Sequence, residues 1–224
     1  MPEPSSLEPF TLEGVHARLE PMDHSHVAAL AAAAAEDRSN YQWTQVPNGE
    51  SQSADYVDRA LAQVAAGSQV AFVIVRKARG SHTARVVGAT RFCELGYWQW
   101  PPGATHQRHG IPDVTDIGHT WLAGSAQRTP VNTEAKLLML THAFEVWQVH
   151  RVALRTDVRN ERSWAAIERI GGTLDGMLRA DRPGTDDTVR TSAHFSIVAS
   201  EWPEVKERLA ARLGGGAGAG AGQS

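Results

Sequence analysis

Residues 127–132 (Gln-Arg-Thr-Pro-Val-Asn) stand where a protein chain readily binds an anion. A strand-like run, residues 115–123, precedes this loop, and a strongly amphipathic segment with helical periodicity, residues 133–149, follows it. Where a strand passes through a tight loop into a helix, unpaired backbone N–H groups and the positive end of the helix dipole face one point. The sequence therefore predicts a site for negatively charged groups such as phosphates.

A second polar position follows the next strand-like run, residues 151–157. Asn160 begins another helical segment, which ends at Gly171 and Gly172. Asparagine is favoured just before a helix, where its side-chain oxygen accepts a hydrogen bond from a backbone N–H of the first turn. Asn160 is therefore a helix cap or a ligand contact, and the two roles are compatible.

Asp116, in the strand that leads to the loop, is the candidate general base. A free aspartate, with a pKa of about 3.9, is a weak base unless burial raises its pKa or a water molecule relays the proton. His119 has a better-matched pKa. Side chains three apart in a strand point to opposite faces, so we expect His119 to pack in the core rather than act with Asp116.

Two long segments, residues 40–49 and 95–114, carry tryptophans among prolines and glycines. Trp43, Trp98 and Trp100 either anchor these loops to the core or wall a pocket for an acceptor substrate, and we assign them to substrate binding. His106 and His109 have no cysteine partner, so we expect no metal site.

The composition is that of an ordinary globular domain: 224 residues, of which 42% are hydrophobic and 21% charged. A net charge of −3 argues against a nucleic-acid partner. Cys93 is the single cysteine, and no apolar run approaches the ~20 residues that span a bilayer. We therefore expect a cytoplasmic protein that does not bind a membrane.

The order of the sequence patterns predicts an α/β (α+β) fold in a single domain. It reads strand, two helices, three strands, helix, strand, helix, two strands, helix, which indicates a mixed, mostly antiparallel central sheet flanked by helices. We assign residues 13–213 to this domain and residues 1–12 to a flexible N-terminal arm. Residues 214–224, almost all glycine and alanine, are predicted to be a disordered tail.

This order and three motifs resemble the GNAT acetyltransferase superfamily, in particular its ribosomal-protein-alanine (RimJ/RimL-like) branch. The resemblance covers roughly residues 11–200 and is densest in residues 116–122, 127–136 and 160–171. The family's pyrophosphate loop reads Gln/Arg-x-x-Gly-x-Gly/Ala. Here Gln127 and Asn132 stand at its ends, and Pro130 takes the place of the central glycine. Proline has no N–H, so one donor of the family pattern is missing.

The resemblance implies acetyl-CoA as co-substrate, with no metal, and direct transfer of the acetyl group to an amine. It assigns coenzyme binding to Leu122, Gln127, Arg128, Thr129, Val131, Asn132, Thr133 and Asn160. A backbone N–H near Leu122 would polarise the thioester carbonyl, and Asp116 would accept the proton of the amine. Many members carry a tyrosine acid where this chain has Ile167, and Ser163 is the residue that the RimL-like branch offers instead.

The acceptor implied is a primary amine, either of a small molecule or of a peptide N-terminus, and the enzyme is a monomer or a homodimer. Two alternatives stay open. Pro130 and Ile167 favour a catalytically silent acyl-CoA-binding or regulatory module on the same fold. A purely structural interaction protein would bind no coenzyme A at all.

Overall fold

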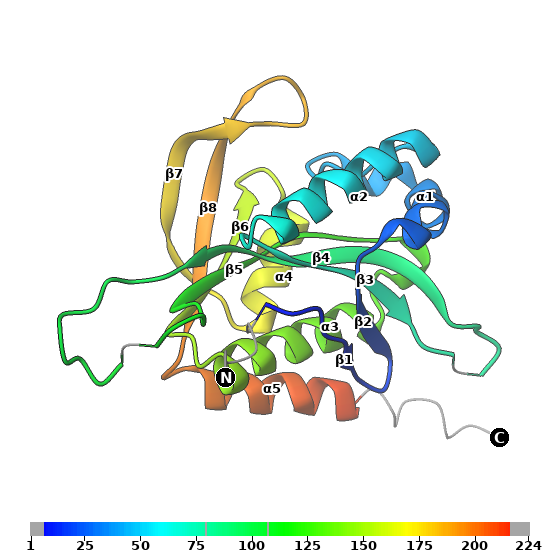
Figure 1. Ribbon diagram of the computed structural model, residues 1–224. Helices are drawn as coiled ribbons and strands as arrows, with labels where there is room; N and C mark the ends of the chain where they lie inside the picture. Colours follow the sequence, from blue (N-terminus) through cyan, green and yellow to red (C-terminus); the bar gives the residue numbers. More distant parts are fainter. Residues whose placement is uncertain (1–6, 79, 107, 216–224) are drawn as a thin grey trace.

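The computed structural model describes residues 7–78, 80–106 and 108–215, which form an eight-stranded sheet with helices on both faces (Figure 1). The first half of the chain contains β1 (Leu12–Glu13), β2 (Ala17–Pro21), α1 (Val27–Ala35), α2 (Gly49–Ala65), β3 (Val70–Arg76) and β4 (Arg85–Gly96). The second half contains β5 (Val114–Leu122), α3 (Pro130–Thr141), β6 (Arg151–Asp157), α4 (Glu161–Ile170), β7 (Thr173–Pro183), β8 (Val189–Val198) and α5 (Trp202–Gly215).

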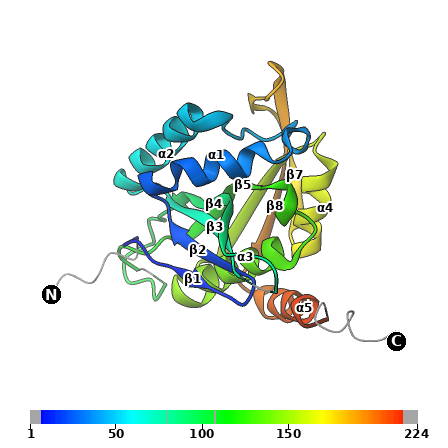
Figure 2. The ribbon, with the colours of Figure 1, turned by 90° about the vertical axis from the view of Figure 1, so that its right-hand side faces the viewer.

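The strands lie in the order β1-β2-β3-β4-β5-β6-β8-β7, and every neighbouring pair is antiparallel except β5 and β6. Helices α1 and α2 cover one face of the sheet, which we call the α2 face (Figures 1 and 2). Helices α3, α4 and α5 cover the other, the α3 face. The predicted fold class and element order are confirmed, and the short strand β1 is an addition to them.

The buried side chains explain why this sheet forms. Strand β3 is buried along nearly its whole length, because helices cover both of its faces. Trp147 and Phe92 pack together on the α3 face with ring centroids 4.6 Å apart, and Phe72 adds an edge contact to Phe92. These large, fully buried rings anchor the sheet against the helix that leads out of the predicted anion-binding loop.

Helix α3 differs from the prediction at both ends. It begins at Pro130 rather than at Thr133, because Thr129 caps it and proline is favoured at the first helical position. The predicted end at residue 149 was also wrong: the helix changes at His142–Val146 into a π-helical turn. At the C-terminus, α5 runs to Gly215, and residues 216–224 of the predicted tail lie outside the described residues.

One buried carboxylate fixes the first strands to α3. Glu134 accepts backbone hydrogen bonds from Val15, His16 and Ala17, at 2.9, 2.6 and 2.6 Å. Gly14 lies against the same carboxylate, where an added Cβ would stand 2.4 Å from Glu134 Cδ. Glu134 thus satisfies three N–H groups that the turn before β2 leaves without a partner in the sheet.

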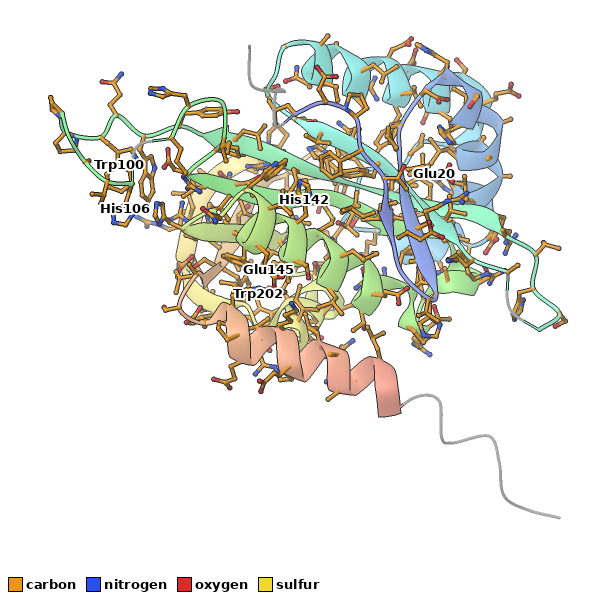
Figure 3. The ribbon with its side chains drawn as sticks, turned by 60° about the horizontal axis from the view of Figure 1, so that its bottom comes forward. Glu20, Trp100, His106, His142, Glu145 and Trp202 are labelled. Carbon is orange, nitrogen blue, oxygen red and sulfur yellow. The ribbon has the colours of Figure 1, made fainter. Side chains whose placement is uncertain are left out.

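Glu134→Gln should lower the free energy of unfolding by about 3 kcal/mol, because a charged acceptor of three hydrogen bonds becomes a neutral amide with one acceptor oxygen. Glu145→Gln is the matched control. Glu145 accepts from Trp202 and Lys206 (Figure 3), and its side chain is 41% exposed, so its loss should cost less than about 1 kcal/mol. Urea denaturation measures the free energy of unfolding of both variants. Equal losses would contradict the role of Glu134 in fixing the first strands to α3.

Candidate functional site

The central feature of the sheet is that β5 and β6, its parallel pair, separate after three residue pairs. The paired residues are Val114 with Arg151, Thr115 with Val152 and Asp116 with Ala153. Beyond these, β5 stays paired with β4 as far as Leu122, and β6 stays paired with β8 as far as Asp157. The sheet therefore opens into two arms, and the inner edge of each arm faces the gap with backbone groups that the neighbouring strand no longer pairs.

Each arm leads into a helix start, so two helix N-termini lie at the mouth of the gap. On the β5 arm, Thr129 caps α3, and its hydroxyl oxygen accepts from the N–H of Val131. On the β6 arm, Asn160 caps α4, and its Oδ1 accepts from the N–H of Ser163 at 3.0 Å. Both helix dipoles place partial positive charge at the open end, which suits an anion.

Arg162 bridges the mouth. From the first turn of α4 it donates to Oε1 of Gln127 at 3.0 Å and to the backbone and side-chain oxygens of Asn40, the latter at 2.7 Å. Gln127 in turn donates from Nε2 to the carbonyl of Leu122 at 3.0 Å. The two arms and the segment after α1 are therefore joined at this point by one exposed cation, a residue that the sequence analysis missed.

Pro130 fits this loop without removing a hydrogen bond from helix α3. It occupies the first helical position, where the backbone N–H has no acceptor within the helix in any case. Arg128, two residues earlier, has a left-handed backbone with φ of +59°. The loop keeps the N–H groups of the residues around proline, and loses only the one that the family pattern places at its centre.

A cavity of about 370 Å³ beside the loop is unsuited to phosphate. Its lining includes Glu36 and Asp37 as well as Gln127 and Arg128. Glu36 already accepts from the N–H of Ser125 at 2.9 Å. Because these carboxylates would repel an anion, we expect an anion to bind at the starts of α3 and α4 rather than in this cavity.

Leu122 is the last residue of β5, and both its N–H and its carbonyl point to the side of the gap, away from β4. Ala123 donates its N–H to Val87 of β4, and successive N–H groups of a strand point to alternate sides, so the N–H of Leu122 points away from β4. The carbonyl of Leu122 accepts from the hydroxyl of Tyr41 at 3.1 Å and from Gln127.

Asp116 lies at the vertex where β5 and β6 separate. It is 8% exposed, and its Oδ2 forms an ion pair with Nε of Arg155 at 2.9 Å. Burial raises the pKa of Asp116 above its ordinary value, and the charge of Arg155 opposes that rise. A buried carboxylate with a raised pKa is a better proton acceptor than a free one.

The expected separation of Asp116 and His119 by strand parity is wrong. Asp116 stands opposite Cys93, and Arg91, two residues along β4 from Cys93, stacks on Tyr56 of α2, so Asp116 is on the α2 face. His119 lines a cavity with Arg91 and Tyr56 and is on that face too. Its side chain is exposed, so the expected packing of His119 in the core is also wrong. The reason is a register shift in the β4–β5 pairing between Ala89 and Arg91, which adds one residue to β5. His119 lies in this bulge with a φ of +52°, so the alternation of faces along β5 is broken there.

The structure does not bring the three tryptophans together. Trp43 packs under the guanidinium of Arg159, with Cζ 4.1 Å from the ring centroid. Trp98 stacks on His150, with ring centroids 5.3 Å apart, and Trp100 donates from Nε1 to Asp113 at 3.0 Å. Trp100 and His106 belong to the segment that projects from one end of the sheet (Figure 3). Their assignment to substrate binding stays a prediction.

The remaining assigned residues follow the two helix starts. Val131 is buried, Asn132 and Thr133 are half-buried in the first turn of α3, and Ser163 is half-buried in the first turn of α4. Within residues 7–78, 80–106 and 108–215, no three His, Cys, Asp or Glu side chains gather as metal ligands would. No helix in that part of the chain is long and apolar enough to cross a membrane.

Comparison with known proteins identifies this arrangement. The family model of the acetyltransferase (GNAT) domain matches residues 16–173, which include the opening sheet and both helix starts. The chain belongs to the GNAT acetyltransferase family.

Individual relatives agree with this membership. A GCN5-related N-acetyltransferase from Brucella melitensis is 25% identical with a TM-score of 0.78, and the match covers 97% of this chain and 91% of that one. RimJ of Mycobacterium smegmatis, solved in complex with CoA-disulfide, has the same fold, with 20% identity, a TM-score of 0.73, and coverage of 92% and 96%. YdaF of Bacillus subtilis, provisionally named a ribosomal N-acetyltransferase, is 30% identical over 97 residues; the match spans 43% of this chain and 52% of YdaF.

A buried lysine of α3, beneath the β5 arm, predicts a pH-dependent stability for this chain. Lys136 of α3 is 4% exposed and donates from Nζ to the hydroxyls of Thr120 and Thr90, at 2.6 and 3.3 Å. Burial lowers its pKa from 10.5 to about 7. In the unfolded chain the same lysine keeps its proton up to a pH of about 10.4.

Between pH 7 and 8.5 the unfolded chain therefore binds more protons at Lys136 than the folded protein does, so this residue makes stability rise with pH. The window ends there because the Cys93 thiol, with a pKa raised to about 12, acts in the opposite direction above its unfolded pKa. Lys136→Met should remove the rise in the free energy of unfolding, and Lys206→Met, at an exposed position, should keep it. An identical rise in both variants would show that another group causes it.

Proposed function

We propose that this protein is an acetyl-CoA-dependent N-acetyltransferase that moves an acetyl group directly to a primary amine. The observation that carries the proposal is the gap between β5 and β6, with two capped helix N-termini at its mouth and Asp116 at its vertex. Family membership supports it, and so does the CoA-disulfide bound to RimJ, a protein of the same fold.

Coenzyme binding is proposed for the two helix starts and the strand end that leads to them. The pyrophosphate would meet the N–H groups of residues 128–133, namely Arg128, Thr129, Val131, Asn132 and Thr133. Gln127 and Arg162 at the mouth offer further donors, Arg162 after exchanging its contacts with Asn40 for the phosphates. The pantetheine arm, an extended chain with amide groups, would lie in the gap against Leu122 and Asn160, where backbone donors and acceptors face inward.

The acceptor amine would reach the vertex from the α2 face, where Asp116 is. The co-substrate supplies an activated acetyl group as a thioester. The amine nitrogen forms the new C–N bond, the C–S bond breaks, and the electron pair of that bond leaves with the thiolate. Asp116, directly or through water, takes the proton that the nitrogen loses. The inward N–H of Leu122 would donate to the carbonyl oxygen as negative charge develops on it.

The departing thiolate needs little help, because a thiol with a pKa near 8.5 is a good leaving group. Ser163 is proposed to donate a hydrogen bond to it from the first turn of α4, and that helix start adds partial positive charge. The acceptor is proposed to be a small amine or a peptide N-terminus. The names of YdaF and RimJ fit the second, and neither is similar enough to fix the acceptor.

The competing function is a silent acyl-CoA-binding module. Two observations favour it: Ile167 stands where many members have a tyrosine and is buried in α4, and Arg155 holds Asp116 in an ion pair. The two functions differ in one measurable property, because only the enzyme releases free thiol from acetyl-CoA when an amine is present.

A thiol-release assay with peptide N-termini, polyamines and aminoglycosides tests the proposal. Asp116→Asn should lower kcat by about 100-fold or more and leave KM for acetyl-CoA within about twofold, since proton transfer is specific to the transition state. Asp58→Asn, at an exposed position on α2, is the control and should leave both unchanged. Acetyl-CoA binding without thiol release from any amine would establish the silent module instead.

The ion pair also predicts a shift with pH. Asp116 acts as a base only when ionised, so kcat should fall on the acid side through its raised pKa. Arg155→Met removes the cation that favours the ionised form, raises the pKa of Asp116 further, and should move this acid limb to higher pH. An unmoved limb would remove Asp116 from the reaction.

A further inference from the structure

Arg91 is a buried cation that pairs with no carboxylate among the residues that the structure describes. It lies in the middle of β4 and is 4% exposed. Its Nη1 donates to Oε1 of Gln69 at 3.1 Å, and its Cζ lies 4.6 Å from the ring centroid of Tyr56. Within the described part of the chain, no ion pair includes Arg91. An uncompensated buried charge is costly, so a protein that retains one gains something from it.

The guanidinium lines a cavity of about 540 Å³ between α2 and the sheet. Two buried donors of its lining have no partner within the structure, Nε of Arg91 and the hydroxyl of Tyr56. A buried donor without an acceptor loses its hydration and gains nothing in return. Both donors belong to residues that line one cavity. An oxyanion bound there could accept a hydrogen bond from each of them.

The charge of the lining also favours an anion. Arg59 and Arg91 line the cavity together with one acidic residue, Asp55, so the formal balance is two positive charges against one negative. His119 is exposed at the cavity wall, and it adds no charge at neutral pH, because desolvation first, and then the charges of Arg91 and Arg182, lower its pKa to about 4. One excess positive charge suits a single carboxylate better than a phosphate dianion, which would leave excess negative charge.

The cavity is close to the vertex where the acceptor amine is proposed to react. Arg91 stands opposite Gly118, and Asp116 is two residues along β5 on the same face, so the two positions are diagonal neighbours in the sheet. Such positions are roughly 7–8 Å apart. Between them the strands carry only Gly118 and Cys93, whose sulfur lies over the glycine. Neither residue adds a large side chain between the two positions.

We propose that the Arg91 cavity binds a carboxylate of the acceptor, so that the substrate is a primary amine that also carries a carboxylate. The proposal rests on the proposed acetyl transfer for the position of the amine. An acidic side chain near a peptide N-terminus has this chemistry, and so does a free ω-amino acid. A purely structural role of Arg91, stacking on Tyr56, would leave the two orphaned donors unexplained.

Matched acceptor pairs test the carboxylate site. The peptide pair is Ala-Glu-Ala-amide and Ala-Gln-Ala-amide, and the small-molecule pair is 6-aminohexanoate and 6-aminohexanamide. In the wild type, kcat/KM should favour the acid of at least one pair by about tenfold or more, and the favoured pair identifies the source of the carboxylate. Arg91→Met should abolish the preference while kcat/KM for the amide member stays within about threefold.

Two further variants distinguish loss of the carboxylate site from unfolding and from the loss of any positive charge. Arg91→Lys retains the charge without the planar fork and should retain part of the preference, which a merely unfolded variant cannot do. Arg169→Met, on the exposed surface of α4, is the control and should keep all of it. Calorimetry with 6-acetamidohexanoate and its amide measures the same preference without turnover.

The outcomes separate this inference from the proposed function. Equal kcat/KM for acid and amide in the wild type overturns the carboxylate site and leaves acetyl transfer intact. No turnover, with binding of 6-acetamidohexanoate that Arg91→Met abolishes, supports the site and overturns the enzyme. Neither turnover nor a preference in binding overturns both.

Discussion

The structure depends on one local event, the parting of two parallel strands. β5 and β6 share three residue pairs and then separate, while each remains paired on its outer side. A sheet usually pairs its backbone groups on both sides of a strand, and unpaired inner groups are costly unless another molecule satisfies them. The gap is therefore maintained by the outer pairings, and it is where an extended ligand with amide groups can replace the missing strand contacts.

The other features of the site follow from this geometry. Because both strands end at the same side, the two helices that follow them begin there, and their positive ends meet at the mouth. Asp116 lies at the vertex and is paired with Ala153 of β6. Arg155, two residues further along β6, forms the ion pair with Asp116. The Arg91 cavity lies on the α2 face. Arg91 and Asp116 are diagonal neighbours on β4 and β5. In the proposed reaction the acceptor approaches from the α2 face, which α1 and α2 cover, while α3, α4 and α5 lie on the other face of the sheet (Figure 2).

Much of this architecture is predictable from the sequence, and the reason is periodicity. The run of residues 151–157 and the helix opened by Asn160 have sharp local signals, an alternating strand and a strong cap, and both agree with the structure. The start of α3 was misplaced because the capping by Thr129 was not recognised. His119 was placed on the wrong face because a β-bulge, which depends on pairing with β4, breaks the parity that a single strand shows. Arg91 carried one usable signal, a charge inside an otherwise apolar run, but its lack of a partner is visible only in three dimensions.

The central claim is that acetyl-CoA occupies the gap between the two arms, and backbone amide NMR tests it most directly. Titration of the wild type with acetyl-CoA should shift the N–H resonances of Leu122, Arg128, Thr129 and residues 131–133 on one arm, and those of Asn160 and Ser163 on the other, with a common dissociation constant. The resonances of Glu36 and Ser125, in the acidic cavity beside the loop, should move little. Shifts that are confined to that acidic cavity or to one arm, or no shift at all at saturating acetyl-CoA, would contradict the account.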